Sequence, residues 1–361
     1  MYKIKKTLCV VLSLSLGGCY NVGSKRLGDD QDKYSSSIIE SNKRQTLQNL
    51  IRLRYADTPG LLDATQLISG YQFQQSAFLG VASDTFPIRP NGGIAAQLQQ
   101  NPTFTFQPVT GDAYAHSFLS PLSPASLLPL AMGGLPIDVL MQLSVQSINS
   151  MSNNRPFSKN TGDVDSNTNY NTEEFFELIH NLRLLQASGL LEIQLQQSPQ
   201  VKEKSYATSH VFLNIYPTQN PSLEKITQIT KKLLNFSSKY KRMEVVYGAG
   251  TPKAGEINIL SRSMLSILGQ VAYQINIPDD ELSSGGSSKH VNKEEGSLMD
   301  IKYGKSNPDN KFVSIYYDKY YYWIDRKDFK SKLAFTITQM LLELSKTNQS
   351  TGAIVTIPVN K

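Results

Sequence analysis

The first residues constrain the rest of the chain most strongly, because they hold its one apolar run of membrane character. Three lysines precede an apolar stretch over residues 8–16, and two glycines follow it. That order is typical of a secretory signal peptide, whereas a membrane-spanning helix needs about 20 apolar residues. We therefore predict that residues 1–18 are a removable signal and that the remaining chain folds as a packed body.

The apolar stretch ends in Leu16-Gly17-Gly18-Cys19, which resembles the lipobox of bacterial lipoproteins. The resemblance implies cleavage after Gly18, lipidation of the Cys19 thiol and acylation of the new N-terminus, which together anchor a protein stably. Tyr20 stands where an Asp favours inner-membrane retention in Gram-negative bacteria, so the implied address is the outer membrane, with the body facing the periplasm. The alternative is an ordinary signal peptide with an incidental cysteine.

Composition excludes several other classes of protein. The hydrophobic fraction of 40% is too high for intrinsic disorder. Cys9 leaves with the signal and Cys19 is consumed by the lipid, so no disulfide scaffold is expected. Losing the three signal lysines lowers the formal charge from +6 to +3. Since no basic run or nucleic-acid-binding motif occurs, we expect no nucleic-acid partner.

The mature chain divides by composition into four predicted segments. Residues 19–37 are polar and read as a flexible tether, followed by an N-terminal α+β domain over residues 38–155. Residues 156–172 are rich in Asn, Ser and Asp and form a predicted linker. Residues 173–361 then form a C-terminal α+β domain.

Apolar periodicity predicts the elements of the first domain. An amphipathic helix is expected over residues 38–55, and alternating apolar and polar residues predict strands over 71–81 and 103–106. Prolines punctuate a helical pattern over residues 111–150, in which Ser123-Pro124 is typical of a helix start and residues 127–145 form an apolar stretch. We interpret that stretch as a buried helical hairpin rather than a membrane span.

The C-terminal domain alternates helices with strands. A strong amphipathic helix over residues 175–189 comes first. Two antiparallel strands over 312–317 and 320–324 precede a helix over 328–344 and a strand over 353–359. This order predicts the α+β fold class, with a mixed strand and helix arrangement in the C-terminal domain.

An Asp- and Asn-rich segment has the ligand spacing of an EF-hand calcium loop. Its oxygen ligands would be Asp163, Asp165, Asn167, Asn169 and Glu174. Thr168 stands where the turn requires Gly, and Tyr170 stands where a small aliphatic residue is usual. We favour the alternative that Asn171 and Glu174 cap the following helix. No other cofactor is expected.

The segment Phe312–Trp323 holds seven aromatic residues, with a predicted hairpin turn at Asp318-Lys319. An exposed face of Tyr317, Tyr320, Tyr322 and Trp323 could stack on glycan rings or anchor a protein partner. The favoured alternative is that alternate aromatic residues pack under the following helix while the others cover a sheet face, since aromatics are ordinary strand formers.

Five segments of the mature chain resemble an uncharacterised group of proteobacterial lipoproteins. They are residues 49–59 (NLIRLRYADTP), 120–128 (SPLSPASLL), 145–149 (VQSIN), 261–265 (SRSML) and 322–332 (YWIDRKDFKSK). The resemblance implies a lipoprotein with a single family architecture, and it implies no activity for any residue.

Recognisable catalytic motifs are missing from the sequence, which has no G-x-S-x-G, P-loop or H-E-x-x-H pattern. We therefore expect a lipid-anchored, non-catalytic envelope protein that binds a protein or peptidoglycan in the periplasm. The alternative is a periplasmic hydrolase with a dispersed active site, in which His180 or His210 would join a carboxylate and a nucleophilic serine. The basic residues of the first helix, among them Arg44 and Arg52, could face anionic membrane or pair with local carboxylates.

Overall fold

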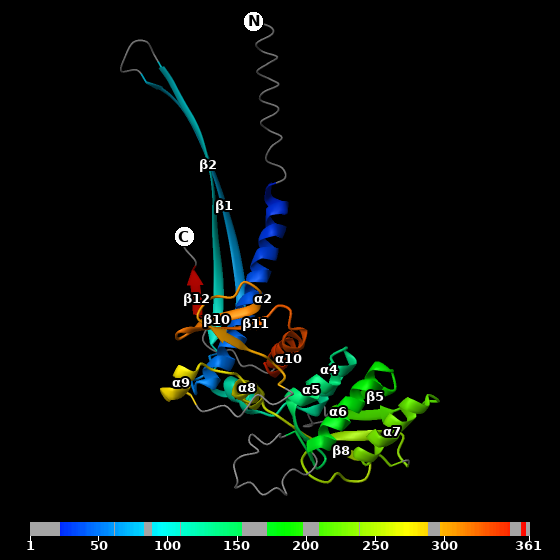
Figure 1. The fold of residues 1–361 in the computed structure, drawn as a ribbon. Coiled ribbons are helices and arrows are strands. Elements are labelled where there is room, and N and C mark those ends of the chain that lie inside the picture. The colour runs from blue at the N-terminus through cyan, green and yellow to red at the C-terminus, as the bar shows by residue number, and fades with distance from the viewer. Residues whose placement is uncertain are drawn as a thin grey trace.

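The computed structural model describes residues 22–60, 62–82, 89–108, 110–153, 172–197, 209–237, 239–287, 297–346 and 355–358. These residues form helices together with mixed sheets, which confirms the predicted α+β class (Figure 1). Within these ranges, no helix combines the length and the apolar character needed to cross a membrane.

Helix α2 (Val22–Arg54) begins far earlier than predicted. The prediction of a flexible coil is therefore wrong for residues 22–37, which are helical. Leu47, Leu50 and Ile51 are fully buried at the other end of α2, as the amphipathic pattern predicts. Extending a packed helix adds one hydrogen bond per residue without a new nucleation cost, so the polar N-terminal part can continue the helix.

Two long strands form an arm that extends away from the body (Figure 1). Strand β1 (Leu62–Ala82) pairs antiparallel with β2 (Arg89–Pro108), and β12 (Val355–Pro358) pairs with residues 103–106 of β2. The predicted strands over 71–81 and 103–106 are confirmed, as parts of longer strands.

The predicted buried helical hairpin is also confirmed. After the short helix α3 (Gly111–Tyr114) and the π-helix η2 (Ala115–Leu119), it consists of α4 (Pro124–Met132) and α5 (Ile137–Ser144). The hydroxyl of Ser123 accepts the backbone N–H of Ser126 and so caps α4, with proline at the first helical position. Leu127, Leu128, Leu140 and Met141 are buried.

A six-stranded sheet forms one half of the body, with the strand order β4-β3-β8-β7-β6-β5. Strands β7 and β8 are parallel and the other neighbours are antiparallel. The strands are β3 (Val145–Ile148), β4 (Met151–Ser152), β5 (Leu191–Gln197), β6 (Ser209–Ile215), β7 (Met243–Tyr247) and β8 (Glu256–Ser261). Burial alternates along β5 to β8, so one face packs against helices. Helices α4 and α6 (Thr172–Ala187) contact the sheet, and α7 (Pro221–Leu233) packs against α6.

A smaller sheet, with the order β10-β11-β9, forms the other half beside α2. The predicted hairpin is confirmed, and its turn residue Asp318 has a φ of 52°. The elements here are β9 (Lys302–Gly304), β10 (Lys311–Tyr317) and β11 (Tyr320–Asp325), with α8 (Met264–Tyr273), α9 (Asp279–Ser283) and α10 (Phe329–Ser345).

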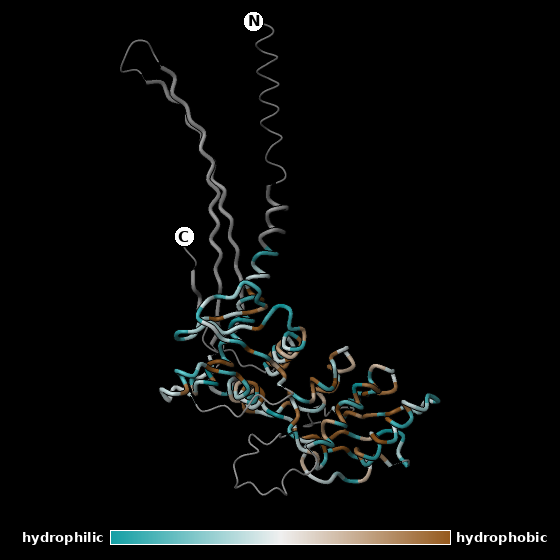
Figure 2. Tube along the Cα trace, in the orientation of Figure 1, coloured by the Kyte–Doolittle hydropathy of each residue, from teal (hydrophilic) through white to brown (hydrophobic). Residues whose placement is uncertain are grey.

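One hydrophobic core joins the chain on either side of the predicted linker at 156–172. Strand β3 precedes that linker and β8 follows it, yet the two strands pair directly. Buried residues from both sides belong to one continuous cluster, and hydrophobic residues run through both halves of the body (Figure 2). The predicted boundary therefore does not separate two hydrophobic cores, while residues 154–171 themselves lie outside the described ranges.

Candidate functional site

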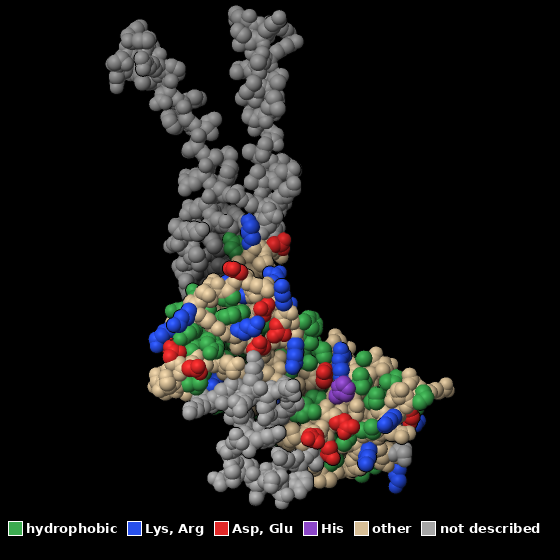
Figure 3. Space-filling model, viewed as in Figure 1, with side chains coloured by type: hydrophobic (Ala, Val, Ile, Leu, Met, Phe, Trp, Pro, Cys, Tyr) green, Lys and Arg blue, Asp and Glu red, His purple; other side chains and the backbone are tan. Residues whose placement is uncertain are grey.

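A polar groove with a volume of about 680 Å³ lies between α2 and the β10–β11 hairpin. We call it the groove. Helix α2 supplies Arg44, Gln48 and Arg52 to its lining, and the hairpin and the residues before it supply Asn307, Lys311, Tyr316 and Tyr321. Lysine and arginine side chains gather along the part of α2 that joins the body (Figure 3).

The groove is cationic. Among the residues described along it, Glu40 is the acidic one, and its carboxylate lies 3.5 Å from the ammonium of Lys43. The Lys311 ammonium donates to the Asn307 amide oxygen at 2.6 Å. Neither Arg44 nor Arg52 has a carboxylate within 4.0 Å in the described part of the chain. Two guanidinium groups are thus available to an anionic ligand.

One wall of the groove is fixed by backbone contacts at the end of α2. The Asn49 side-chain amide donates to the Gly60 carbonyl at 2.8 Å, and the Gly60 N–H donates to the Asn49 amide oxygen at 3.0 Å. A Cβ at position 60 would lie 3.1 Å from a guanidinium nitrogen of Arg52. Glycine at this position therefore leaves room for the Arg52 side chain against the chain that follows α2.

The aromatic residues that line the groove are Tyr316, which is exposed, and Tyr321, which is half-buried. Tyr316 is 59% exposed, and its ring centroid lies 5.0 Å from that of Tyr321, its partner in the strand register. The alternation of side chains between the two faces of β10 could have predicted this pair. Apolar Val313 and Ile315 face inward, so Tyr316 lies on the opposite face.

The four aromatic residues predicted to bind a partner do not share one exposed face. Tyr320 and Tyr322 are 7% and 0% exposed, while Tyr317 and Trp323 are half-buried. The inward tyrosines instead serve internal contacts. The hydroxyls of Tyr322 and Tyr55 lie 2.6 Å apart, and the Tyr317 hydroxyl donates to the Asp57 carboxylate.

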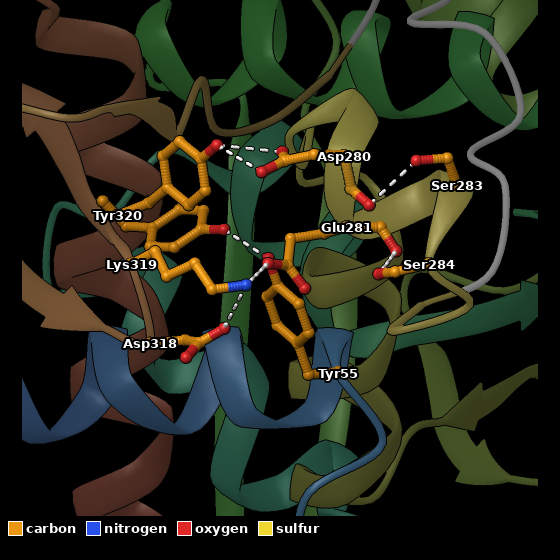
Figure 4. A network of polar contacts seen from close by, with 9 residues as sticks. Tyr55, Asp280, Glu281, Ser283, Ser284, Asp318, Lys319 and Tyr320 are labelled. Carbon is orange, nitrogen blue, oxygen red and sulfur yellow. Dashed lines mark hydrogen bonds and ion pairs between the residues drawn. The ribbon is translucent and has the colours of Figure 1, made fainter.

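A network of tyrosines and carboxylates joins the hairpin to α2 and α9 (Figure 4). The Tyr320 hydroxyl donates to the Asp280 carboxylate at 2.7 and 2.9 Å. Glu281 is 7% exposed, and its carboxylate accepts from the Lys319 ammonium at 3.3 Å, which raises the pKa of that ammonium. Burial raises the pKa of Tyr322, so its phenol stays neutral. The network therefore holds the hairpin wall of the groove in place.

The network gives folding stability a defined pH dependence. The hydrogen bond from Tyr320 lowers the pKa of the Asp280 carboxyl below its ordinary value of 3.8 and raises the pKa of Tyr320 to about 12. The lowered carboxyl pKa contributes stability above about pH 4, which is lost as the pH falls through the lowered value. The raised phenol pKa contributes stability below about pH 10, which is lost as the pH rises toward 12.

We expect Tyr320→Phe to flatten both limbs of this profile, because it removes the phenol and its hydrogen bond together. The measurement is the urea midpoint of both proteins from pH 2.5 to 7 and from pH 9 to 12. Asp325 provides an internal control, since the backbone N–H of Lys327 lowers its pKa in both proteins and should leave a residual acid slope. Identical profiles would contradict the assignment.

In the described part of the chain, neither His180 nor His210 joins a carboxylate and a serine hydroxyl as the predicted hydrolase site requires. His210 on β6 lies 2.6 Å from the Glu244 carboxylate on β7, both half-buried, and within the described ranges no serine hydroxyl hydrogen-bonds to it. His116 and His180 are exposed, and His290 lies outside the described residues. The hydrolase alternative stays a prediction.

The remaining predicted site residues fall mostly outside the described ranges. These are Gly18, Cys19, Asp163, Asp165, Asn167 and Asn169, together with the capping residue Asn171. Glu174 is exposed in the first turn of α6, where a carboxylate stabilises the positive end of the helix dipole. No cluster of three His, Cys, Asp or Glu residues that could hold a metal ion occurs in the described part of the chain.

Sequence reasoning missed the groove because its lining combines residues 40–60 with residues 307–321. Chemically, its guanidinium groups, amides and tyrosine rings can bind a polar anionic ligand. No protein-family model, curated protein or solved structure matches this chain.

Proposed function

We propose that this chain is a lipid-anchored, non-catalytic envelope protein of a Gram-negative bacterium that binds an acidic cell-wall glycan in the groove. The observation that carries the proposal is the pair of guanidinium groups, Arg44 and Arg52, that lack a carboxylate partner in the described residues and lie in one groove with the Tyr316–Tyr321 pair. Guanidinium binds carboxylates in bidentate geometry, and tyrosine rings offer flat faces to sugar rings. The carboxylates of peptidoglycan fit this chemistry.

The position of α2 supports a ligand held away from the membrane. If Cys19 carries the lipid, α2 begins three residues later at Val22. The helix rises about 1.5 Å per residue, so Arg44 lies roughly 33 Å along it from Val22. A helical spacer of that length favours a cell-wall ligand over the lipid headgroups at its base.

Binding to purified peptidoglycan tests the proposal directly. We expect Arg44→Glu with Arg52→Glu to weaken co-sedimentation with sacculi at least tenfold, because the reversed charges repel glycan carboxylates. The matched control is Lys225→Glu with Lys253→Glu, two exposed residues outside the groove lining that change the net charge equally. Equal affinity of the two double variants, or no binding by the unchanged protein, would overturn the glycan assignment.

The anchor is tested separately by metabolic labelling with a fatty-acid analogue. We expect the unchanged chain to carry label and to fractionate with the outer membrane. Cys19→Ser should lose the label and appear in the soluble periplasmic fraction, since the thiol is the lipid attachment point. Label retained by Cys19→Ser would contradict lipidation at that residue, and it would leave the glycan result unaffected.

A further inference from the structure

A basic turn borders one end of the groove. Residues 325–332 read DRKDFKSK and join β11 to α10, and we call them the basic turn. Its first residue, Asp325, lies opposite Lys311 in the strand register, and Lys311 lines the groove. The N–H of the next residue, Arg326, donates to the Asn310 carbonyl at 3.2 Å. The basic turn therefore lies directly beside the Lys311 end of the groove.

The two carboxylates of the basic turn are engaged within the fold. Asp325 accepts the Lys327 N–H at 2.9 Å, and its other oxygen lies 3.5 Å from the Lys302 ammonium on β9. Asp328 caps α10, where it accepts the Ser331 N–H at 3.0 Å. In the described part of the chain, neither carboxylate forms an ion pair with a basic side chain of the turn. The positive charge of the turn is therefore not neutralised from within.

Three cations and an aromatic ring of the basic turn are presented to solvent. Arg326, Lys327 and Lys330 are exposed, and no carboxylate of the described ranges lies within 4.0 Å of their side-chain nitrogens. Phe329 lies among them and is 71% exposed. Clustered positive charge attracts anionic groups, and an aromatic ring offers a flat apolar face. The basic turn thus repeats the combination of cations and aromatic rings that lines the groove.

The contacts of α2 with β10 give the groove a direction. The two elements lie side by side (Figure 1). Near the start of β10, the Lys43 ammonium lies 4.5 Å from the centroid of the Phe312 ring. At the end of β10, the ring centroids of Tyr55 and Tyr317 lie 5.2 Å apart. Helix α2 therefore runs along β10 in the same direction as the strand.

This direction sets the order of the cations along the groove. Arg44 and Lys311 lie toward the end that the basic turn borders, and Arg52 lies toward the opposite end with Tyr316. Tyr316 follows Lys311 by five positions, which corresponds to roughly 17 Å of strand. Beyond Lys311 the positive charge continues in the basic turn, which carries Phe329. The groove and the turn together therefore form one cationic path with an exposed aromatic ring toward each end.

We propose that the ligand is an acidic polysaccharide chain that runs along the groove and continues across the basic turn, with anionic groups on successive units. This inference rests on the proposed glycan function and deepens it, because it names a polymer rather than a small sugar acid. Once the groove holds one segment of a chain, the next segment reaches the turn at a high effective concentration. A lipid surface could contact the exposed turn, but it would not extend into the groove. Continuity of the two cationic surfaces therefore favours a chain.

Glycan length tests the proposal. The probes are two soluble preparations from the same sacculi, namely disaccharide–peptide fragments and long glycan strands that carry the same peptides. Fluorescence anisotropy measures the affinity for each labelled preparation, with concentration counted per disaccharide. We expect the unchanged protein to bind the strands at least tenfold more tightly than the fragments, because only the strands span both surfaces.

Variants of the basic turn separate its contribution from that of the groove. We expect Lys327→Glu with Lys330→Glu to weaken strand binding at least tenfold and to leave fragment binding nearly unchanged. Phe329→Ala should weaken strand binding several-fold, and its exposed ring makes a loss of folding unexpected. The matched control is again Lys225→Glu with Lys253→Glu, which changes the net charge equally. Far-UV circular dichroism verifies the folding of each variant.

The possible failures are distinguishable. If the fragments bind but the strands bind no more tightly, or if the basic-turn variants bind strands normally, the extended path is overturned while the groove assignment stands. If neither preparation binds, the proposed glycan function is overturned and this inference with it. Phosphatidylglycerol vesicles test the other occupant. Vesicle binding that the basic-turn variants lose, with strand binding intact, would assign the turn to a membrane and overturn the proposal.

Discussion

Replacing Asn149 by alanine is expected to lower the free energy of unfolding by about 3–5 kcal/mol, because it removes both side-chain hydrogen bonds of a buried residue and places alanine in a left-handed backbone conformation. Its N–H donates to the Asn258 carbonyl at 2.7 Å, and its amide oxygen accepts the Asn258 N–H at 2.9 Å. Its side-chain amide donates to the Leu234 carbonyl at 3.3 Å. The residue is 7% exposed, so water cannot replace the lost side-chain partners.

Two further variants separate the hydrogen bonds from the backbone strain. Asn149 has a φ of 51°, where alanine costs roughly 1 kcal/mol and glycine costs little. Asn149→Gly should therefore recover only that strain. Asn235→Ala, at an exposed residue with a φ of 55°, should lose only that strain. Urea denaturation measures all three variants, and equal losses for Asn149→Ala and Asn235→Ala would contradict the assignment.

Local pattern was sufficient for most elements of the body. The Ser123-Pro124 start, the apolar periodicity of α6 and the alternation in β10 and β11 each follow from interactions within one segment. The helix over residues 22–37 was not predicted, because this polar sequence lacks the apolar periodicity of an amphipathic helix. Its helix continues one that the buried residues near Leu50 stabilise. A helix that extends from a packed segment needs no apolar pattern in the residues that it adds, so their sequence does not predict it.

The groove and the shared core could not be predicted, since both depend on contacts between distant segments. Arg52 and Lys311 line one groove although more than 250 residues separate them. The segments that resemble the lipoprotein group also contact one another although they are far apart in the sequence. Residues 145–149 pair with the strand that leads into residues 261–265, and the Ser261 hydroxyl donates to the Leu122 carbonyl. Tyr55 and Tyr322 join the other two segments. Contacts between such distant segments leave no periodic pattern within either segment, so the sequence does not predict them.

The second large effect is expected at Arg262, which caps a helix from a distant part of the chain. Its guanidinium donates to the carbonyls of Gln142 and Leu143 at 3.1 and 3.2 Å, in the last turn of α5. Those carbonyls lack intrahelical partners and carry the negative end of the helix dipole. The residue is 5% exposed, and burial lowers its pKa to about 10, so it stays charged at neutral pH.

Arg262→Ala should therefore cost about 3–4 kcal/mol, because it removes the guanidinium donor from the Leu143 carbonyl, leaves the Gln142 carbonyl with only the Asn153 side-chain amide at 2.9 Å, and leaves a cavity. Arg262→Lys should recover part of that loss, since an ammonium keeps the charge and lacks the planar fork that reaches both carbonyls. Chemical denaturation measures the stability, and hydrogen exchange in the last turn of α5 locates the effect. Unchanged protection there, or equal losses for Ala and Lys, would show that Arg262 acts through packing alone. The expected order, with alanine worst and lysine intermediate, would show that a buried cation from beyond residue 172 completes a helix that ends at Ser144.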